Sequence, residues 1–236
     1  MGKGKLYLIP VVIADATQGS VIPTQVREVL PSIQYFLAEE IRTARRYLSS
    51  LKVYESIEPL QFQVLNKKTK PAELKELFKP IEDGKNLGVL SESGCPGVAD
   101  PGAIAVAYAH KHNIVVVPLV GPSSLLLSLM ASGLNGQKFA FHGYLPIDSK
   151  DRLQAIRELE KESKQKNQTQ LFIETPYRNQ AVYNDLVKGL SNTTLLTVAY
   201  DITGSAELIK TKSVAEWKKE KLILDKLPCV FLLLAE

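Results

Sequence analysis

Short runs of apolar and β-branched residues alternate with amphipathic stretches along the whole chain. The runs predict strands and the stretches predict helices, because the two structures differ in length and in apolar spacing. We expect strands at 5–12, 35–38, 87–90, 114–118, 138–143, 168–174, 194–200, 207–211 and 229–235. We expect helices at 24–30, 40–51, 71–82, 101–112, 123–132, 150–163, 179–190 and 214–219. Continuous runs such as IVVVPL and VFLLLA are typical of strands covered on both faces, so the pattern predicts an α/β fold with largely parallel sheets.

The chain is interrupted most sharply at 118–124, PLVGPSS, where a predicted strand ends and a Gly-Pro step follows. We therefore predict two domains. The first, 1–118, is an N-terminal α/β domain that carries a glycine-rich loop, and the second, 119–236, is a C-terminal α/β domain.

The composition is that of an ordinary folded protein. Of the 236 residues, 45% are hydrophobic and 23% are charged, which excludes a disordered tail protein and a fibrous repeat. The formal net charge of +4 is spread evenly over the two halves, so any surface for nucleic acid must be local.

Neither the cysteines nor the histidines predict a metal or disulfide framework. Cys95 and Cys229 lie far apart without CxxC spacing, and the three histidines are scattered. No apolar run approaches the ~20 residues of a membrane span. The run 6–14 contains Pro10 and is followed by no small-residue cleavage site, so it predicts a core strand rather than a signal peptide. We expect a cytoplasmic protein with no membrane segment.

The loop SESGCPGVADPG, at 91–102, carries the strongest signal for a binding site. It holds three glycines and two prolines between a predicted strand and a predicted helix. Open α/β sheets bind ligands at the carboxyl ends of their strands, and glycine lets the main chain approach a ligand closely. Asp100 before Pro101 is explained by helix capping. The loop as a whole is longer than a plain connection, which favours a functional role.

Two further strand ends carry candidate chemistry. In VGPSS, at 120–124, Ser123 or Ser124 could cap the next helix or offer hydroxyls to a ligand at its N-terminus. In LFIETPYR, at 171–178, Glu174 is either a hydrogen-bond acceptor for a ligand or part of a surface turn.

A predicted helix within AEEIRTARRY, at 38–47, carries three arginines on one face. Arg42, Arg45 and Arg46 have i, i+3, i+4 spacing and could bind phosphates. Alternatively, they form a solvated face that pairs with the acidic residues one turn earlier, Glu39 and Glu40.

Taken in order, these motifs resemble those of the tetrapyrrole (corrin/porphyrin) methylase family. Within it, the chain is most similar to the bacterial 16S rRNA cytidine ribose-2′-O-methyltransferase subfamily. That subfamily reads AEDTRxTRRLL, SDAGTPxxSDPG, VxPxPGPSA, YExPHR and ARELTK. The corresponding segments here are AEEIRTARRYL, SESGCPGVADPG, VVPLVGPSS, IETPYR and AYDITG. The resemblance covers essentially the whole chain.

The resemblance implies a fold of two αβα domains, usually in a homodimer, with S-adenosylmethionine in the cleft between the domains. By motif position, the residues implied to line that cleft are Ser93, Gly94, Cys95, Pro96, Ser123 and Ser124, together with main chain near Phe172 and Ala199. No metal is implied.

The implied activity is methyl transfer to ribosomal RNA of the small subunit, which depends chiefly on holding donor and acceptor in line. A ribose hydroxyl gains from a general base, and Glu40 and Glu174 are the candidates. Arg42, Arg45 and Arg46 are the first candidates for phosphate contacts, and Lys67, Lys68 and Lys70 form a second basic cluster.

Departures from the subfamily pattern keep two alternatives open. The N-terminal PTPIGNLxDIT is here PVVIADATQGSVIP, Cys95 replaces a threonine, and Tyr177 replaces a histidine. Glu40 and Ile41 replace Asp and Thr, and the chain ends at Glu236 before the subfamily's small C-terminal domain. The alternatives are a methyltransferase acting on a small molecule such as a tetrapyrrole, and a protein that binds S-adenosylmethionine without catalysis.

Overall fold

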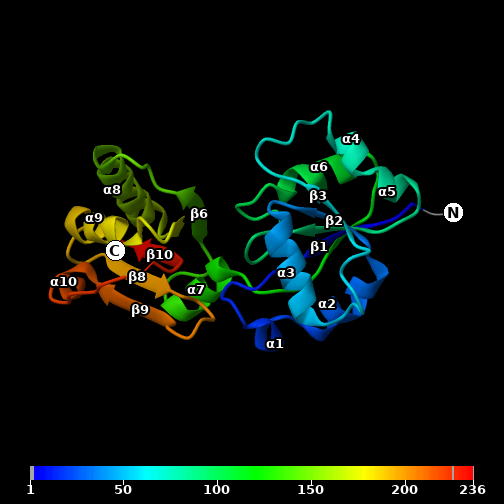
Figure 1. Ribbon diagram of the computed structural model, residues 1–236. Helices are drawn as coiled ribbons and strands as arrows, with labels where there is room; N and C mark the ends of the chain where they lie inside the picture. Colours follow the sequence, from blue (N-terminus) through cyan, green and yellow to red (C-terminus); the bar gives the residue numbers. More distant parts are fainter. Residues whose placement is uncertain (1–2, 225, 236) are drawn as a thin grey trace. The chain divides into compact units, whose positions relative to one another are not determined.

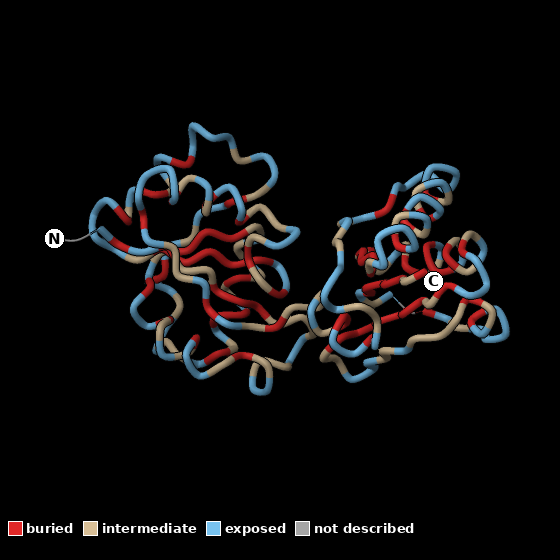
Figure 2. The backbone as a smooth tube through the Cα atoms, turned by 180° about the vertical axis from the view of Figure 1, so that it is seen from behind, coloured by how far each residue is buried: buried red, intermediate tan, exposed pale blue. Residues whose placement is uncertain are grey.

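The computed structural model describes residues 3–224 and 226–235. The chain divides into two compact units, Met1–Ser123 (unit 1) and Ser124–Glu236 (unit 2). The junction that we place after Pro118 lies shortly before this division. Figure 2 shows that the strands form the buried interior of each unit.

Unit 1 is built on a five-stranded sheet in which every pairing is parallel, as predicted. The strand order is β3-β2-β4-β1-β5. The strands are β1 (Leu6–Ile9), β2 (Tyr35–Ala38), β3 (Gln61–Val64), β4 (Leu87–Leu90) and β5 (Val116–Pro118).

Helices cover both faces of this sheet (Figure 1). They are α1 (Gln18–Val21), α2 (Thr24–Val29), the 3-10 turn η1 (Leu30–Ser32), α3 (Ile41–Leu51), α4 (Leu74–Leu77), α5 (Lys79–Glu82) and α6 (Gly102–Lys111). Side chains alternate along each strand, so Phe36 packs in one core cluster with α2 and α3 while Leu37 packs in a second with α4, α5 and α6. Both cores are apolar, which explains why the strands read as continuous hydrophobic runs.

Unit 2 corrects the expectation of largely parallel sheets. Its strands are β6 (Phe139–Tyr144), β7 (Thr169–Glu174), β8 (Leu195–Tyr200), β9 (Leu208–Ser213) and β10 (Cys229–Leu234), in the order β6-β7-β10-β8-β9. Only the β6–β7 pairing is parallel, and the other three are antiparallel. The short segment 201–207 joins β8 to β9 as a hairpin, and a connection this short allows only antiparallel pairing.

The helices of unit 2 are α7 (Ser124–Ser132), α8 (Ser149–Lys166), α9 (Asn179–Gly189) and α10 (Val214–Trp217). Residues of α8, α9 and α10 share one core cluster with Phe172 and Phe231 of the sheet. On the other face, the Thr211 hydroxyl bonds to that of Thr197 and donates to the carbonyl of Ser132 in α7. The unit therefore also has its sheet between two helical layers.

Three elements differ from the sequence-based prediction. Strand β3 was missed, and helix α1 was missed. The helix expected at 71–82 is broken into α4 and α5. Pro80 has no N–H to donate, and in a continuous helix its ring would clash with the carbonyl four residues earlier. In the described residues, no helix is both long and apolar enough to cross a membrane.

Candidate functional site

The glycine loop leaves the carboxyl end of β4 and is tied to the chain that follows β1. Val11 and Gly94 exchange two main-chain hydrogen bonds, of 2.9 and 3.1 Å. Gly94 has φ of +69° and Gly97 has φ of +83°, a left-handed conformation that favours glycine. The sequence places glycine where this turn needs it, and the loop is held against the edge of the sheet.

Asp100 shapes the second half of the loop. One carboxylate oxygen accepts hydrogen bonds from the N–H of Gly97 at 2.5 Å and of Gly102 at 2.8 Å. Burial raises the pKa of Asp100, while these two donors lower it. Asp100 thus binds the first N–H of α6, but the residue directly before the helix is Pro101, so the cap expected at Asp100 is placed one residue too early.

Cys95 joins the glycine loop to the VGPSS segment. Its Sγ lies 3.3 Å from the carbonyl oxygen of Pro122. Next to it, Gly121 lies against Pro10 so closely that an added Cβ would be 2.0 Å from the Pro10 Cβ. The buried Tyr47 hydroxyl donates to the Pro10 carbonyl at 2.7 Å. Three segments far apart in sequence thus meet at one edge of the unit 1 sheet.

Carboxylates gather at the same edge. Glu39 and Glu40 follow β2, and Glu92 follows β4, the neighbouring strand, with Ala38 in register with Leu90. Burial raises the pKa of Glu92, and the charges of Glu39 and Glu40 raise it further against hydrogen bonds from Glu40 and Thr43. Sequence reasoning missed Glu92. No local pattern marks it, because Glu92 approaches Glu40 only when β2 and β4 pair.

Helix α3 starts from this acidic edge. The Glu40 side chain caps it by accepting from the N–H of Arg42 at 3.1 Å. The alternative of a solvated face predicted that Arg45 pairs with Glu39 or Glu40, and the structure does not show this pairing. Instead, Arg45 forms a 2.9 Å ion pair with Glu58 and lies over the ring of Phe62, 5.5 Å from its centroid.

The remaining cations of this region are exposed to solvent. Arg42 and Arg46 on α3 are exposed, as are Lys67, Lys68 and Lys70 after β3. Arg42 and Arg46 are therefore open to a phosphate in a way that Arg45 is not.

In unit 2, Glu174 is a buried anchor rather than part of a surface turn. Its side chain is 1% exposed, and its Oε2 lies 2.5 Å from Nη2 of Arg178. Its Oε1 accepts from the main-chain N–H of Thr175 at 2.7 Å. Arg178 also donates to the carbonyl of Leu145 at 3.0 Å. Both carboxylate oxygens thus have partners within the unit.

Phe172 and Ala199 lie on either side of β10, in register with Phe231 and Val230. Phe172 is fully buried and its ring stacks on Phe231 at 5.8 Å, so its side chain belongs to the core. Its main chain faces the bulge of β6, where the register shifts between Phe141 and Tyr144. Ala199 is also paired on its other side, with Ile209 of β9, so a contact of these two strands with a ligand stays a prediction.

The AYDITG segment follows the end of β8 that lies beside Glu174, and its backbone is strained. Asp201 and Thr203 have φ of +49° and +66°. Asp201 accepts from the N–H of Ala206 at 2.8 Å, and an added Cβ on Gly204 would be 2.2 Å from the Asp201 carboxylate. Among the described residues, Thr203 Oγ1 and Arg178 Nε are buried polar atoms without a hydrogen-bond partner. Such atoms cost free energy until a ligand or water satisfies them.

The structure therefore brings Ser93, Gly94, Cys95 and Pro96 together with the segment that ends in Ser123. Ser93 is exposed, Gly94 and Pro96 are buried, and Ser123 is half-buried. Ser124 opens α7, where its carbonyl accepts from the hydroxyl of Ser128 at 2.5 Å. Among the described residues, no group of three or more His, Cys, Asp or Glu residues is arranged to hold a metal ion.

Comparison with known proteins gives consistent relatives over most of the chain. Ribosomal RNA small subunit methyltransferase I of Escherichia coli O157:H7 is 30% identical over 224 residues, which cover 92% of this chain and 73% of that protein. The protein of the same name from Buchnera aphidicola subsp. Acyrthosiphon pisum is 26% identical over 220 residues, with 92% and 74% covered. That from Synechocystis sp. is 30% identical over 200 residues, with 85% and 67% covered.

No family model matches the sequence. Among solved structures, a crystal structure of the methyltransferase CobJ superposes with a TM-score of 0.63 at 13% identity, covering 100% of this chain and 95% of that one. At this identity the likeness shows the fold alone.

Proposed function

Because this chain belongs to the family of ribosomal RNA small subunit methyltransferase I, we propose that it transfers a methyl group from S-adenosylmethionine to a cytidine ribose 2′-hydroxyl of 16S rRNA. The observation that carries the proposal is the 30% identity to the Escherichia coli relative, which spans 92% of this chain.

We assign the cofactor to the glycine loop and the VGPSS segment, through Ser93, Gly94, Cys95, Pro96 and Ser123. Three features of the residues support this fit. Gly94 and Gly97 present main chain rather than side chains, Ser93 offers an exposed hydroxyl, and Cys95 fastens the two segments together. When bound, S-adenosylmethionine supplies a methyl group on a sulfonium sulfur, an electrophile that needs no metal. The contributions expected from Ser124, Phe172 and Ala199 stay predictions.

The ribose hydroxyl loses a proton as its oxygen is methylated, and we assign Glu40 to accept it. Glu40 is exposed and its side chain makes a single 3.1 Å hydrogen bond, whereas both oxygens of Glu174 are already occupied. Glu92 lies close enough to Glu40 for the Glu40 charge to add to the effect of burial in raising the pKa of Glu92.

We assign Arg42 and Arg46 to phosphates of the RNA. Both are exposed on α3, the helix that Glu40 caps, so a strand bound along this helix would bring its ribose toward the acidic edge. A homodimer and a cytoplasmic location stay predictions from the family resemblance.

Calorimetric titration with S-adenosylmethionine tests the cofactor assignment. Ser93→Trp fills the exposed side of the loop without touching the core, and Gly94→Trp adds bulk within the loop. Gly133→Trp is the matched control. Gly133 has φ of +71°, close to the +69° of Gly94, and no atom lies within 4 Å of a Cβ added there. Circular dichroism checks that each variant folds.

We expect saturable binding to the wild type, weakened at least about tenfold by Ser93→Trp and Gly94→Trp and unchanged by Gly133→Trp. Equal affinity in all four proteins would contradict the assigned site. Binding that is accompanied by methylation of a tetrapyrrole, and not of RNA, would favour the small-molecule alternative. Binding without transfer to either would favour a protein that has lost catalysis.

A further inference from the structure

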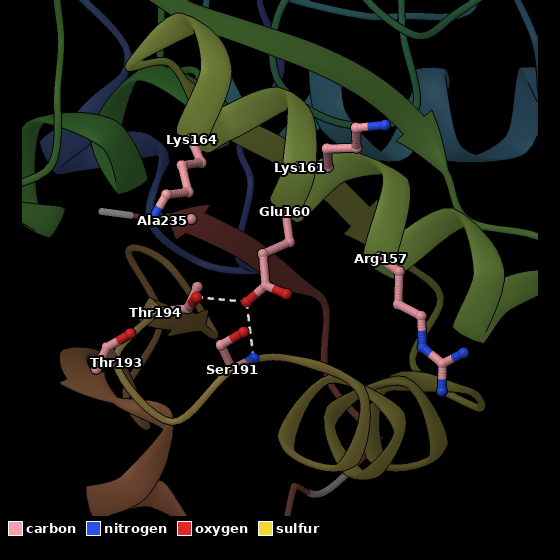
Figure 3. Close-up of a pocket in the computed structure, with 8 residues that line it drawn as sticks. All are labelled: Arg157, Glu160, Lys161, Lys164, Ser191, Thr193, Thr194 and Ala235. Carbon is pink, nitrogen blue, oxygen red and sulfur yellow. Dashed lines mark hydrogen bonds between the residues drawn. The ribbon is translucent and has the colours of Figure 1, made fainter.

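Unit 2 carries a pocket between helix α8 and the segment that precedes β8 (Figure 3). Its volume is about 300 Å³. One wall is the face of α8, and the other is the segment before β8, with Ala235 after β10 at one end. The residues that line it are Arg157, Glu160, Lys161, Lys164, Ser191, Thr193, Thr194 and Ala235.

The α8 wall is cationic. Arg157, Lys161 and Lys164 follow one another at i, i+4 and i+7, which places them on one face of the helix. Arg157 and Lys161 are exposed, and within the described part of the chain neither forms an ion pair.

Two other cations of the same helix form ion pairs within unit 2. Arg152 pairs with Asp185 at 2.5 Å, and Lys166 pairs with Glu162 at 2.5 Å. Arg157 and Lys161 are thus the cations beside the pocket that an external anion can use.

The opposite wall is preformed and rich in hydroxyls. Glu160 reaches across, and its Oε1 accepts from the N–H of Ser191 at 2.7 Å and from the hydroxyl of Thr194. Lys218 donates to the side chain of Asn192 at 2.6 Å, which fixes the same segment from outside. The hydroxyl-bearing residues Ser191 and Thr193 are exposed at the rim. Among the described residues that line the pocket, Glu160 is the only carboxylate, and it is engaged in holding the wall, so the charges of Arg157 and Lys161 outweigh it.

Within unit 2, the pocket and the AYDITG segment lie at opposite ends of strand β8. Thr194 precedes β8 and Tyr200 ends it, next to the AYDITG segment. Six residues of extended strand span about 20 Å. A ligand that engages both ends must therefore be an extended polymer, which a tetrapyrrole is not.

We propose that this pocket binds a backbone phosphate of the substrate RNA. The inference rests on the proposed function, since it takes RNA as the substrate. Arg157 and Lys161 supply the charge, and the hydroxyls of Ser191 and Thr193 supply hydrogen bonds. Such a contact positions the RNA and carries no sequence information.

The test measures how RNA affinity depends on salt, with the full chain and 16S rRNA transcript. The variant is Arg157→Gln/Lys161→Gln. The matched control is Lys150→Gln/Lys221→Gln, which removes two exposed lysines of unit 2 outside the pocket. Each lost phosphate contact lowers the slope of log K against log salt by about 1. We expect a slope shallower by about 1 for the pocket variant, which loses one phosphate contact, no change for the control, and unchanged affinity for S-adenosylmethionine in both.

The failures are distinguishable. If the wild type methylates RNA and the pocket variant keeps its RNA affinity and salt slope, the pocket proposal is wrong and the proposed function stands. If the wild type neither binds nor methylates the RNA, the proposed function itself fails. Inorganic phosphate is titrated as a separate probe. Saturation by inorganic phosphate that leaves RNA affinity unaffected would show a site for free phosphate and would overturn the RNA assignment.

Discussion

The Sγ of Cys95 lies 3.3 Å from the carbonyl oxygen of Pro122, and this contact fastens the glycine loop to the segment that ends unit 1. Burial raises the pKa of the Cys95 thiol above its usual value, so the thiol stays protonated at neutral pH. Because the thiolate is the nucleophile, Cys95 is a structural donor rather than a reactive group under these conditions.

Alkylation by iodoacetamide checks this state of Cys95. We expect slow modification at pH 7.5, a steep rise above pH 9, and protection at both pH values when S-adenosylmethionine is bound. Cys95→Ser is the control, because the other cysteine, Cys229, is buried and should not react. Mass spectrometry locates the label. Rapid alkylation of Cys95 at pH 7.5 would show an activated thiol and contradict this interpretation.

Gly121 tests how closely the VGPSS segment must pack on the chain after β1. Gly121→Ala places a Cβ 2.0 Å from the Cβ of Pro10, so one of the two backbones must shift. We expect a loss of about 1 to 3 kcal/mol in the free energy of unfolding, typical of overpacking. Gly136→Ala is the control, since an added Cβ there meets no atom within 4 Å. Chemical denaturation measures both, and equal stabilities would refute the close packing.

We expect the loss of Glu40 to lower activity and the loss of Glu174 to lower stability. Glu40→Gln keeps an oxygen that can cap α3, so we expect unchanged stability and a kcat lowered about 100-fold. Glu174→Gln leaves Arg178 without its ionised partner, so we expect a loss of about 3 kcal/mol in the free energy of unfolding.

Paired assays of kcat and denaturation on these two variants decide between the roles. If Glu174→Gln were stable but inactive, and Glu40→Gln fully active, the assignment of the base would be reversed.

The arginines of α3 should contribute unequally to RNA binding. Arg42 and Arg46 are exposed, whereas Arg45 is held by Glu58 and Phe62. We expect Arg42→Gln/Arg46→Gln to reduce the salt slope of RNA binding by about 2, and Arg45→Gln to reduce it by much less. Fluorescence anisotropy at several salt concentrations measures the slopes. A larger effect from Arg45→Gln would indicate that RNA displaces Glu58.

Sequence patterns located the strands of unit 1 well where burial is complete. Strands β2 and β4 have the predicted bounds because every residue of β4, and all but the first of β2, is buried in an apolar core. Strand β3 was missed because QFQV is a short edge strand with mostly exposed side chains, and so lacks an apolar run. Edge strands of this kind are defined by the neighbour they pair with, which composition does not record.

Strand direction in unit 2 was harder to predict. The position of β10 between β7 and β8 joins distant parts of the chain, and no local pattern encodes it. The β8–β9 hairpin could have been recognised from the glycine-containing segment 201–207.

The candidate site was predictable in its loops and less so in its side chains. The left-handed turns at 94 and 97 explain why glycine stands there, whereas Asp100 holds the loop through Gly97 and is not the residue directly before α6. The proximity of Glu92 to Glu40 arises only when β2 and β4 pair, so a linear reading does not bring these two residues together.

Methyl transfer to RNA tests the central claim most directly. The protein is incubated with tritium-labelled S-adenosylmethionine and small ribosomal subunits that lack the modification, and the RNA is digested to nucleosides. The account predicts label in 2′-O-methylcytidine for the wild type and its loss in Ser93→Trp, with Gly133→Trp remaining active. Absence of labelled RNA from a folded protein that binds S-adenosylmethionine, or label on a base rather than a ribose, would contradict it.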